Sequence, residues 1–235
     1  TRATVGFEAN DVQPDTDFTL YFAPEKDELG VNLLTHKTSG DDGYFMLLVS
    51  PGVAAKDKKL LPKDVAFVLD TSGSMAGKKL EQAKKALSFC VENLNEGDRF
   101  EIIRFSTEVE PLFDKLVEAN ARNRDQAEDF IKGLKPIGGT AIDDALKQAL
   151  SLRSNRGEEA LPEGGRRKAG DRPFVIIFLT DGRPTIGTTD EEQIVKNVTR
   201  LNENRTRIFC FGIGTDVNTH LLDKITEDTR AFSQY

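Results

Sequence analysis

Residues 65–75 have the sequence VAFVLDTSGSM, an apolar run that ends in Asp70, Ser72 and Ser74. Five consecutive apolar residues, with valine and phenylalanine among them, are typical of a strand buried on both faces of a parallel sheet. The end of the run offers the carboxylate of Asp70 and the hydroxyl groups of two serines, and Gly73 leaves the backbone between the serines free to bend. Such oxygen donors suit Mg²⁺, Ca²⁺ or Mn²⁺, whereas zinc and copper prefer nitrogen or sulfur. The stretch therefore predicts a buried strand with a candidate site for a hard cation at its end.

Each of these side chains also has an ordinary structural explanation. Asp70 is consistent with an acid near the start of a helix, Ser74 with the N-cap of that helix, and Ser72 with a turn. Short motifs match many unrelated sequences by chance. The metal-site interpretation therefore depends on whether distant segments of the chain supply matching oxygen ligands.

The composition argues against some classes of partner. The chain of 235 residues has a formal net charge of -7, which disfavours nucleic acid or an anionic membrane surface as its main partner. It contains no apolar stretch of about 18 residues and no charged and then apolar leader, so we expect neither a membrane span nor a signal peptide in it. The two cysteines, Cys90 and Cys210, predict neither a disulfide framework nor a metal cluster. We assign no catalytic role to the two histidines, His36 and His220.

From residue 63 onward, apolar runs alternate with patterns of helical period. Further strands are predicted at 99–106, 174–179 and 207–213, with a short antiparallel edge at 109–113 and a final strand at 231–235 that the chain end cuts short. Helices are predicted between them, for example where Leu80, Ala83 and Leu87 recur at helical spacing. This alternation favours an α/β fold, a doubly wound and mainly parallel sheet with helices on both faces. Such sheets bind ligands at the carboxyl ends of their strands, where the strand order reverses.

Two distant segments bring further oxygen groups to that edge of the predicted sheet. The strand at 174–179 is followed by Thr180 and Asp181, and Gly139 and Thr140 precede a helix. The alternatives stay open for single residues, because Asp181 also suits a turn and Thr140 also suits a capping box with the acid three residues later. Taken together, the three segments converge on one candidate site.

Local signals predict one helix start and one loop. Thr189 and Glu192 form the pattern of a capping box, ahead of a helix that contains Ile194 and Val198. The segment at 153–172 is polar, charged and rich in glycine, and this composition predicts a surface loop.

Residues 1–62 have a different pattern. Strands are predicted at 17–23, 30–35 and 44–50. The last two, joined by a turn at 38–43, predict an antiparallel β-hairpin appended on the N-terminal side of the α/β domain. Residues 51–62, which contain three lysines, predict an exposed linker.

The order of the polar motifs resembles the von Willebrand factor A domain over residues 63–235. In that family a metal-ion-dependent adhesion site (MIDAS) is built from a DxSxS sequence, a threonine and an aspartate, in this order. The resemblance implies that Ser72, Ser74 and Thr140 supply hydroxyl ligands to Mg²⁺, with Mn²⁺ or Ca²⁺ as alternatives. It implies that Asp70 and Asp181 act directly or through water. It also implies a protein-binding module, in which a carboxylate of a partner protein completes the coordination of the metal.

The N-terminal part resembles a more specific family. Residues 17–21 (DFTLY) and 43–51 (GYFMLLVSP) are similar to the tail of a VIT domain and its junction with the A domain in proteins of the inter-alpha-trypsin inhibitor heavy-chain type. The resemblance implies that residues 1–62 are a VIT remnant with a linker. It also favours an extracellular or cell-surface location.

Two other functions were weighed against this one. A metal that only stabilises the loops stays open as an alternative. A Mg²⁺-dependent phosphohydrolase with Asp70 as nucleophile would have to be similar to the haloacid-dehalogenase-like phosphatases. These need a second acid two residues later, where this chain has Ser72. Neither serine lies in the G-x-S-x-G pattern of a serine hydrolase. We therefore expect an adhesion or assembly module that is not an enzyme.

Overall fold

The computed structural model describes residues 6, 29–38, 40, 42–51, 61–154, 159–160, 166–167, 172–203 and 206–235. The chain divides into two compact units, Thr1–Lys59 and Leu60–Tyr235. The strand predicted at 17–23 and most of the predicted linker lie outside the described residues. No helix among the described residues is long and apolar enough to cross a membrane.

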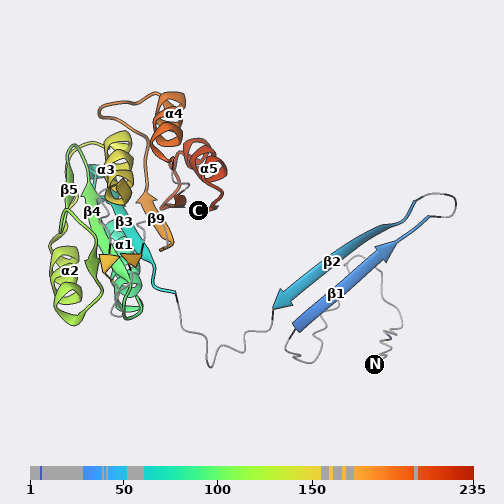
Figure 1. The fold of residues 1–235 in the computed structure, drawn as a ribbon. Helices are drawn as coiled ribbons and strands as arrows, with labels where there is room; N and C mark the ends of the chain where they lie inside the picture. Colours follow the sequence, from blue (N-terminus) through green and yellow to red (C-terminus); the bar gives the residue numbers. More distant parts are fainter. Residues whose placement is uncertain are drawn as a thin grey trace. The chain divides into compact units, whose positions relative to one another are not determined.

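A β-hairpin forms nearly all of the described part of the first unit (Figure 1). β1 (Leu29–His36) pairs antiparallel with β2 (Tyr44–Pro51), from Leu29 opposite Pro51 to His36 opposite Tyr44. Gly40, in the connection, has a φ of 97°, which glycine adopts without steric cost. The predicted hairpin is confirmed. Its large apolar side chains are more than half exposed: Leu33, Leu34, Tyr44, Phe45, Met46, Leu47, Leu48 and Val49.

A single sheet organises the second unit. Seven strands in its described part follow the order β11-β10-β9-β3-β4-β5, with β6 beside β4. The parallel strands are β3 (Asp64–Asp70), β4 (Arg99–Phe105), β9 (Phe174–Thr180), β10 (Arg207–Gly212) and β11 (Ser233–Gln234). The antiparallel ones are β5 (Val109–Pro111) and β6 (Val117–Glu118), which both pair with β4. Because β3 lies between β4 and β9, the strand order reverses beside β3, and doubly wound sheets bind ligands at such a switch point.

Helices cover both faces of the sheet, as predicted (Figure 1). α1 (Lys78–Glu92) and α2 (Ala121–Gly133) pack on one face, and α3 (Ile142–Ser154), α4 (Glu191–Leu201) and α5 (Thr219–Asp228) pack on the other. β3 is buried along its whole length. Its alternate side chains enter opposite cores, Phe67 with α1 and α2 and Val68 with α3, α4 and α5. A strand that serves two cores needs a continuous apolar run, and this is the pattern of residues 65–69.

Two local predictions need correction. The N-cap of α4 is Asp190, whose side chain accepts a hydrogen bond from the Gln193 amide, so the capping box predicted at Thr189 does not form. Aspartate caps helices at least as well as threonine, and here it begins the helix one residue later. The predicted loop at 153–172 starts inside α3 and contains two short strands that pair antiparallel, β7 (Glu159–Ala160) and β8 (Arg166–Arg167). Its other residues lie mostly outside the described ones.

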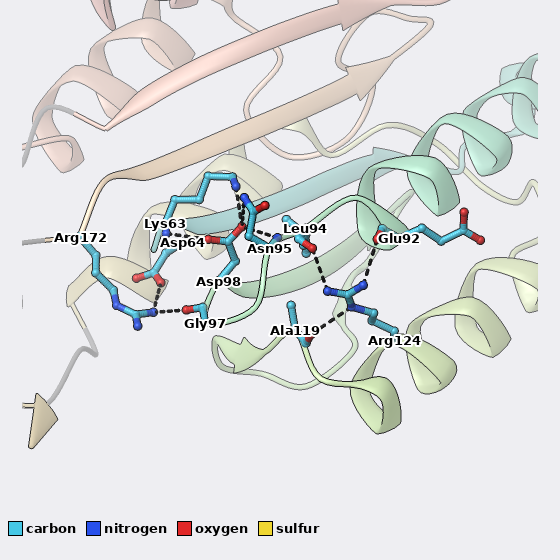
Figure 2. Close-up of polar contacts among 10 residues, drawn as sticks. All are labelled: Lys63, Asp64, Glu92, Leu94, Asn95, Gly97, Asp98, Ala119, Arg124 and Arg172. Atoms are coloured by element: carbon cyan, nitrogen blue, oxygen red, sulfur yellow. Dashed lines mark hydrogen bonds and ion pairs between the residues drawn. The ribbon is translucent and has the colours of Figure 1, made fainter. Parts of the chain in front are cut away.

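Asp98 organises the amino-terminal edge of the sheet, opposite the switch point (Figure 2). Its buried carboxylate accepts hydrogen bonds from the backbone amides of Lys63 (2.9 Å) and Asn95 (2.8 Å), and it forms an ion pair with the Lys63 ammonium. Burial raises the pKa of the Asp98 carboxyl, but the bonds from Lys63 and Asn95 outweigh it, so that the net pKa lies below the ordinary 3.8. The carboxylate thus ties the entry of β3 to the turn before β4.

Arginine side chains complete this edge (Figure 2). Arg99 binds the buried carboxylate of Asp64 through two nitrogens at 3.0 and 2.9 Å, and Arg172 approaches the same carboxylate at 3.4 Å. Arg124, on α2, donates hydrogen bonds to three backbone carbonyl oxygens, those of Ala119, Glu92 and Leu94. Because Glu92 is the last residue of α1, this guanidinium binds carbonyl groups that a helix end leaves without partners.

We expect Asp98→Asn to lower the free energy of unfolding at neutral pH by about 1 to 3 kcal/mol, since hydrogen bonds to a charged group contribute about this much. The pKa of Asp98 is lower in the folded than in the unfolded chain. Its contribution is therefore complete above the unfolded pKa of about 3.9 and is lost as the pH falls through the folded value. Denaturant titrations of variant and parent should accordingly differ at about pH 7, and the difference should shrink in acid as the pH falls through the lowered folded pKa of Asp98.

Asp125→Asn is the control, because Asp125 is exposed on α2 and its change should alter the free energy of unfolding by less than about 0.5 kcal/mol. A loss in Asp98→Asn that stays constant with pH would contradict the role assigned to the carboxylate charge.

Candidate functional site

The predicted oxygen ligands gather at the carboxyl ends of β3 and β9, beside the switch point. Asp70 is the last residue of β3, and Asp181 directly follows the last residue of β9. The two strands pair in parallel, so their ends lie side by side. The other predicted ligands come from the turn after β3 and from the loop before α3. We call these five side chains the oxygen cluster: Asp70, Ser72, Ser74, Thr140 and Asp181.

Asp70 is the innermost member of the oxygen cluster. Its side chain is buried, Oδ1 accepts a hydrogen bond from the Ser72 amide at 2.8 Å, and Oδ2 accepts one from Thr180 Oγ1 at 2.6 Å. Burial raises the pKa of the Asp70 carboxyl, and the hydrogen bonds from Thr180 and Ser72 offset this only in part. The carboxylate is therefore held in a fixed orientation but lacks a full compensating charge.

A chain of short contacts links Ser72 to Asp181. The two serine hydroxyl oxygens lie 3.0 Å apart, on the short helix η1 (Gly73–Met75) and its N-terminal flank. Ser74 Oγ donates to Asp181 Oδ1 at 2.8 Å, although the two residues are far apart in sequence. Asp181 Oδ2 in turn accepts a hydrogen bond from Lys79 Nζ at 2.6 Å. The serines and the aspartate that were predicted as ligands therefore meet in one place.

Backbone contacts bring the loop before α3 to this place. The Gly73 amide donates to the Gly138 carbonyl oxygen at 3.0 Å, and the Ile137 amide donates to the Thr71 carbonyl oxygen at 2.8 Å. Gly138 has a φ of 73°, and a Cβ there would lie 2.5 Å from Thr107 Oγ1. A glycine is thus required at 138 both by the backbone conformation and by space.

The backbone of Thr140 is fixed from the opposite side by Thr185. Thr185 Oγ1 accepts a hydrogen bond from the Thr140 amide at 2.9 Å, and the Thr185 amide donates to the Thr140 carbonyl oxygen, also at 2.9 Å. At Gly139 a Cβ would lie 2.8 Å from Thr185 Oγ1, so the close approach depends on that glycine. Thr185 therefore positions Thr140 beside Ser74 and Asp181, with which it lines one cavity.

The local contacts disagree with the simplest alternatives for two members of the cluster. The N-cap of α1 is Gly77, so Ser74 does not cap that helix. The Thr140 amide binds Thr185, and the Asp143 carboxylate binds Asn197 and Lys147 instead of closing a capping box with Thr140. Both hydroxyl groups are therefore available for another role.

The chemistry of the cluster fits a hard divalent cation. It combines two carboxylates with three hydroxyl groups, and all of its members except Ser74 are buried. Buried carboxylates need a positive partner, and Lys79 already supplies one to Asp181. Among the described residues, no three histidine, cysteine, aspartate or glutamate side chains gather as a metal-binding group. A site here would thus rely on carboxylate and hydroxyl oxygens with water, which suit a hard cation, and not on nitrogen or sulfur.

Sequence reasoning missed three residues that contact the cluster: Thr180, Thr185 and Lys79. Thr180 had a signal, since it directly precedes a predicted ligand at the end of a buried strand. Thr185 had none, because the Thr140 amide that it binds is 45 positions away in the sequence.

Comparison with known proteins decides the family. The family model described as the von Willebrand factor type A domain matches residues 63–235. The chain belongs to the von Willebrand factor type A family. Its A domain has the mainly parallel sheet with helices on both faces that the sequence predicted.

The A domain is similar both to curated protein sequences and to solved structures. Human inter-alpha-trypsin inhibitor heavy chain H4 is 39% identical over 189 residues, which are 80% of this chain and 19% of that protein. The chain thus spans about a fifth of the length of this curated relative. A solved von Willebrand factor type A structure from Catenulispora acidiphila is 20% identical, with a TM-score of 0.62 over 87% of this chain and 42% of that one. Proximal thread matrix protein 1 from the mussel byssus, solved with zinc in its MIDAS motif, is 24% identical, with a TM-score of 0.54 over 74% of this chain and 41% of that one.

We expect Thr185→Val to free the Thr140 amide, because valine keeps the shape of threonine but cannot accept the hydrogen bond. The loss of one such bond costs about 1 kcal/mol, which is about a fivefold faster amide exchange at Thr140. Hydrogen exchange followed by NMR measures this rate residue by residue. Thr185→Ser keeps the hydroxyl and should exchange as the parent does, and equal rates in all three proteins would remove Thr185 from the positioning role.

Proposed function

We propose that the A domain is a divalent-cation-dependent protein-binding module, used for adhesion or assembly, with its metal held by the oxygen cluster. The observation that carries the proposal is the convergence of two buried carboxylates and three hydroxyls at the switch point of the sheet. In this proposal Ser72, Ser74 and Thr140 bind the metal through their hydroxyl oxygens. Asp70 and Asp181 act directly or through water.

Magnesium is the cation that we propose first, with Mn²⁺ and Ca²⁺ as alternatives. Mg²⁺ requires six oxygen ligands in near-octahedral geometry and commonly keeps several waters. Three hydroxyls leave positions open, and uncharged inner ligands leave much of the charge of the metal unneutralised. The zinc found in the mussel protein's MIDAS motif supports a cation at this position of the fold, but oxygen donors alone favour a harder ion than zinc.

The proposed ligand is a carboxylate from a partner protein. A cavity of about 530 Å³ opens beside Ser74, Thr140 and Asp181. An acidic side chain that enters this cavity would exchange with a water on the metal, and the remaining positive charge of the metal would attract it. The similarity to inter-alpha-trypsin inhibitor heavy chain H4 supports a protein partner and an extracellular or cell-surface setting.

We propose no catalytic role for the cluster. In the described part of the chain, His220 bonds to Glu191, whereas Ser72 and Ser74 bond to each other and to Asp181. Among these contacts no histidine is thus placed to activate either serine as a nucleophile. We also propose that residues 1–62 are the VIT remnant and linker and that the A domain spans 63–235.

We expect calorimetric titration of chelator-stripped protein to detect one Mg²⁺ site. The Ser72→Ala, Ser74→Ala double variant should bind about 10- to 100-fold more weakly or not at all, since changes around a metal commonly cost this much affinity. Ser88→Ala, which removes a hydroxyl near the other end of α1, is the control and should bind as the parent does. Parent-like metal binding by the double variant would mean that the site is wrongly placed.

Binding of a partner carboxylate is tested separately, with a displayed peptide library and the Asp181→Asn variant. We expect peptides selected in Mg²⁺ to contain an acidic residue, and to lose binding in chelator, with Asp181→Asn, or when that residue becomes its amide. The metal-free fold should lose about 1 to 3 kcal/mol, since the change removes the charge that pairs with Lys79 but no core volume. Undiminished peptide binding under all three changes would refute the adhesion proposal, even if the metal binds.

A further inference from the structure

Lys79 places a positive charge inside the oxygen cluster. Its Nζ lies 2.6 Å from Asp181 Oδ2, and the Asp181 side chain is fully buried while that of Lys79 is about 30% exposed. Lys79 belongs to the first turn of α1, so its backbone is fixed by the helix. A charge-assisted hydrogen bond of this length to a buried carboxylate is among the stronger polar contacts in proteins.

The stem of Lys79 is also held in place. It lies against the backbone of Gly214, in the loop after β10, where a Cβ would be 2.8 Å from Lys79 Cε and 3.2 Å from Nζ. Gly214 has a φ of 102°, so that position favours glycine in any case. Because Gly214 has no side chain, the Lys79 side chain can pack against the backbone there. It reaches Asp181 from the side of the cavity that Lys79 and Asp181 both line.

The charges of the cluster show what this contact does. Asp70 and Asp181 are both buried, and Lys79 is the cation that hydrogen-bonds to Asp181. A divalent ion at the cluster would take over the neutralisation of both carboxylates. If the ammonium stayed where it is, ion and ammonium would repel each other at close range in a partly desolvated site, where like charges cost far more than in water. Metal and ammonium therefore compete for Asp181.

We propose that Lys79 is an internal counter-cation, which occupies Asp181 in the metal-free protein and which a divalent metal must displace. Lys79 is then a positioning residue that weakens metal binding and, without metal, offsets the repulsion between the Asp70 and Asp181 carboxylates. The inference rests on the proposed metal site. It predicts that removing the ammonium tightens metal binding, the opposite of what loss of a supporting residue does.

Three lysine variants test the competition by calorimetric titration with Mg²⁺. Lys79→Met keeps the length of the stem without the charge, and we expect it to bind Mg²⁺ about 10-fold more tightly than the parent, because the ion no longer has to break a charge-assisted bond. Lys79→Arg retains a cation and should stay close to the parent. Lys78→Met removes the same charge from the adjacent exposed residue, and it should change the affinity by less than about twofold. Unchanged or weaker binding by Lys79→Met, or an equal gain in Lys78→Met, overturns the proposal.

Amine labelling of the parent protein gives a second readout. We follow the acylation of individual lysines by mass spectrometry in chelator and in saturating Mg²⁺. Lys79 should react more slowly than Lys78 in chelator and should speed up when Mg²⁺ releases its ammonium from Asp181, while Lys78 stays constant. Labelling of Lys79 that does not respond to bound Mg²⁺ overturns the displacement.

Failure of the metal site and failure of this inference give different results. If neither the parent nor any variant binds Mg²⁺, the proposed function fails and the competition fails with it. If the parent binds and Lys79→Met binds equally, only the role of Lys79 fails. Denaturant titration in chelator checks the ion pair without any metal: Lys79→Met should be less stable than Lys78→Met, because only the former leaves Asp181 buried without its cation.

Discussion

The parallel pairing of β3 with β9 and β4 is the constraint on which the site depends. Backbone hydrogen bonds hold Leu69 opposite Leu179 and Asp70 opposite Phe105, so the three strands end at one edge of the sheet. Since β3 is buried on both faces, a slip by one residue would exchange the side chains of its two cores. The apolar packing of the strand thereby fixes the position of Asp70 and of the turn that follows. The polar chemistry at this edge is placed by the core and not by the loops alone.

Buried carboxylates have different hydrogen-bond and ion-pair partners at the two edges of the sheet. At the amino-terminal edge, Asp98 has a lysine and two backbone amides, and its pKa is lower than usual. At the carboxyl edge, Asp70 accepts hydrogen bonds from the Thr180 hydroxyl and the Ser72 amide, and burial raises its pKa. The first arrangement is complete within the chain and serves stability. The second leaves the negative charge of Asp70 only partly compensated near Asp181, which lines a cavity, and such a charge favours a cation beside it.

The features that sequence predicted are those that follow from local periodicity. Strands such as β3 and β9 serve two cores, so they need continuous apolar runs, and topology then brings the residues after them to one edge. The contacts that fix Thr140 are of another kind, because Thr185 reaches it across two loops that no periodic pattern relates. The start of α4 was misplaced since Thr189 and Asp190 are both competent caps in adjacent positions.

The choice between Lys78 and Lys79 follows from the phase of α1. Leu80, Ala83 and Leu87 form the buried stripe of this helix. Successive residues are separated by about 100° around the helix axis. Lys79 therefore lies about 100° from Leu80, at the margin of the stripe. Lys78 lies about 160° from Leu80, on the exposed side of the helix. A lysine at that margin buries its stem and can turn its ammonium toward a polar site at the helix start. The sequence shows which residues share the buried face of α1, but it does not show where the helix starts. Gly77 is the N-cap, and it is recognisable as such only from the structure of the turn after β3.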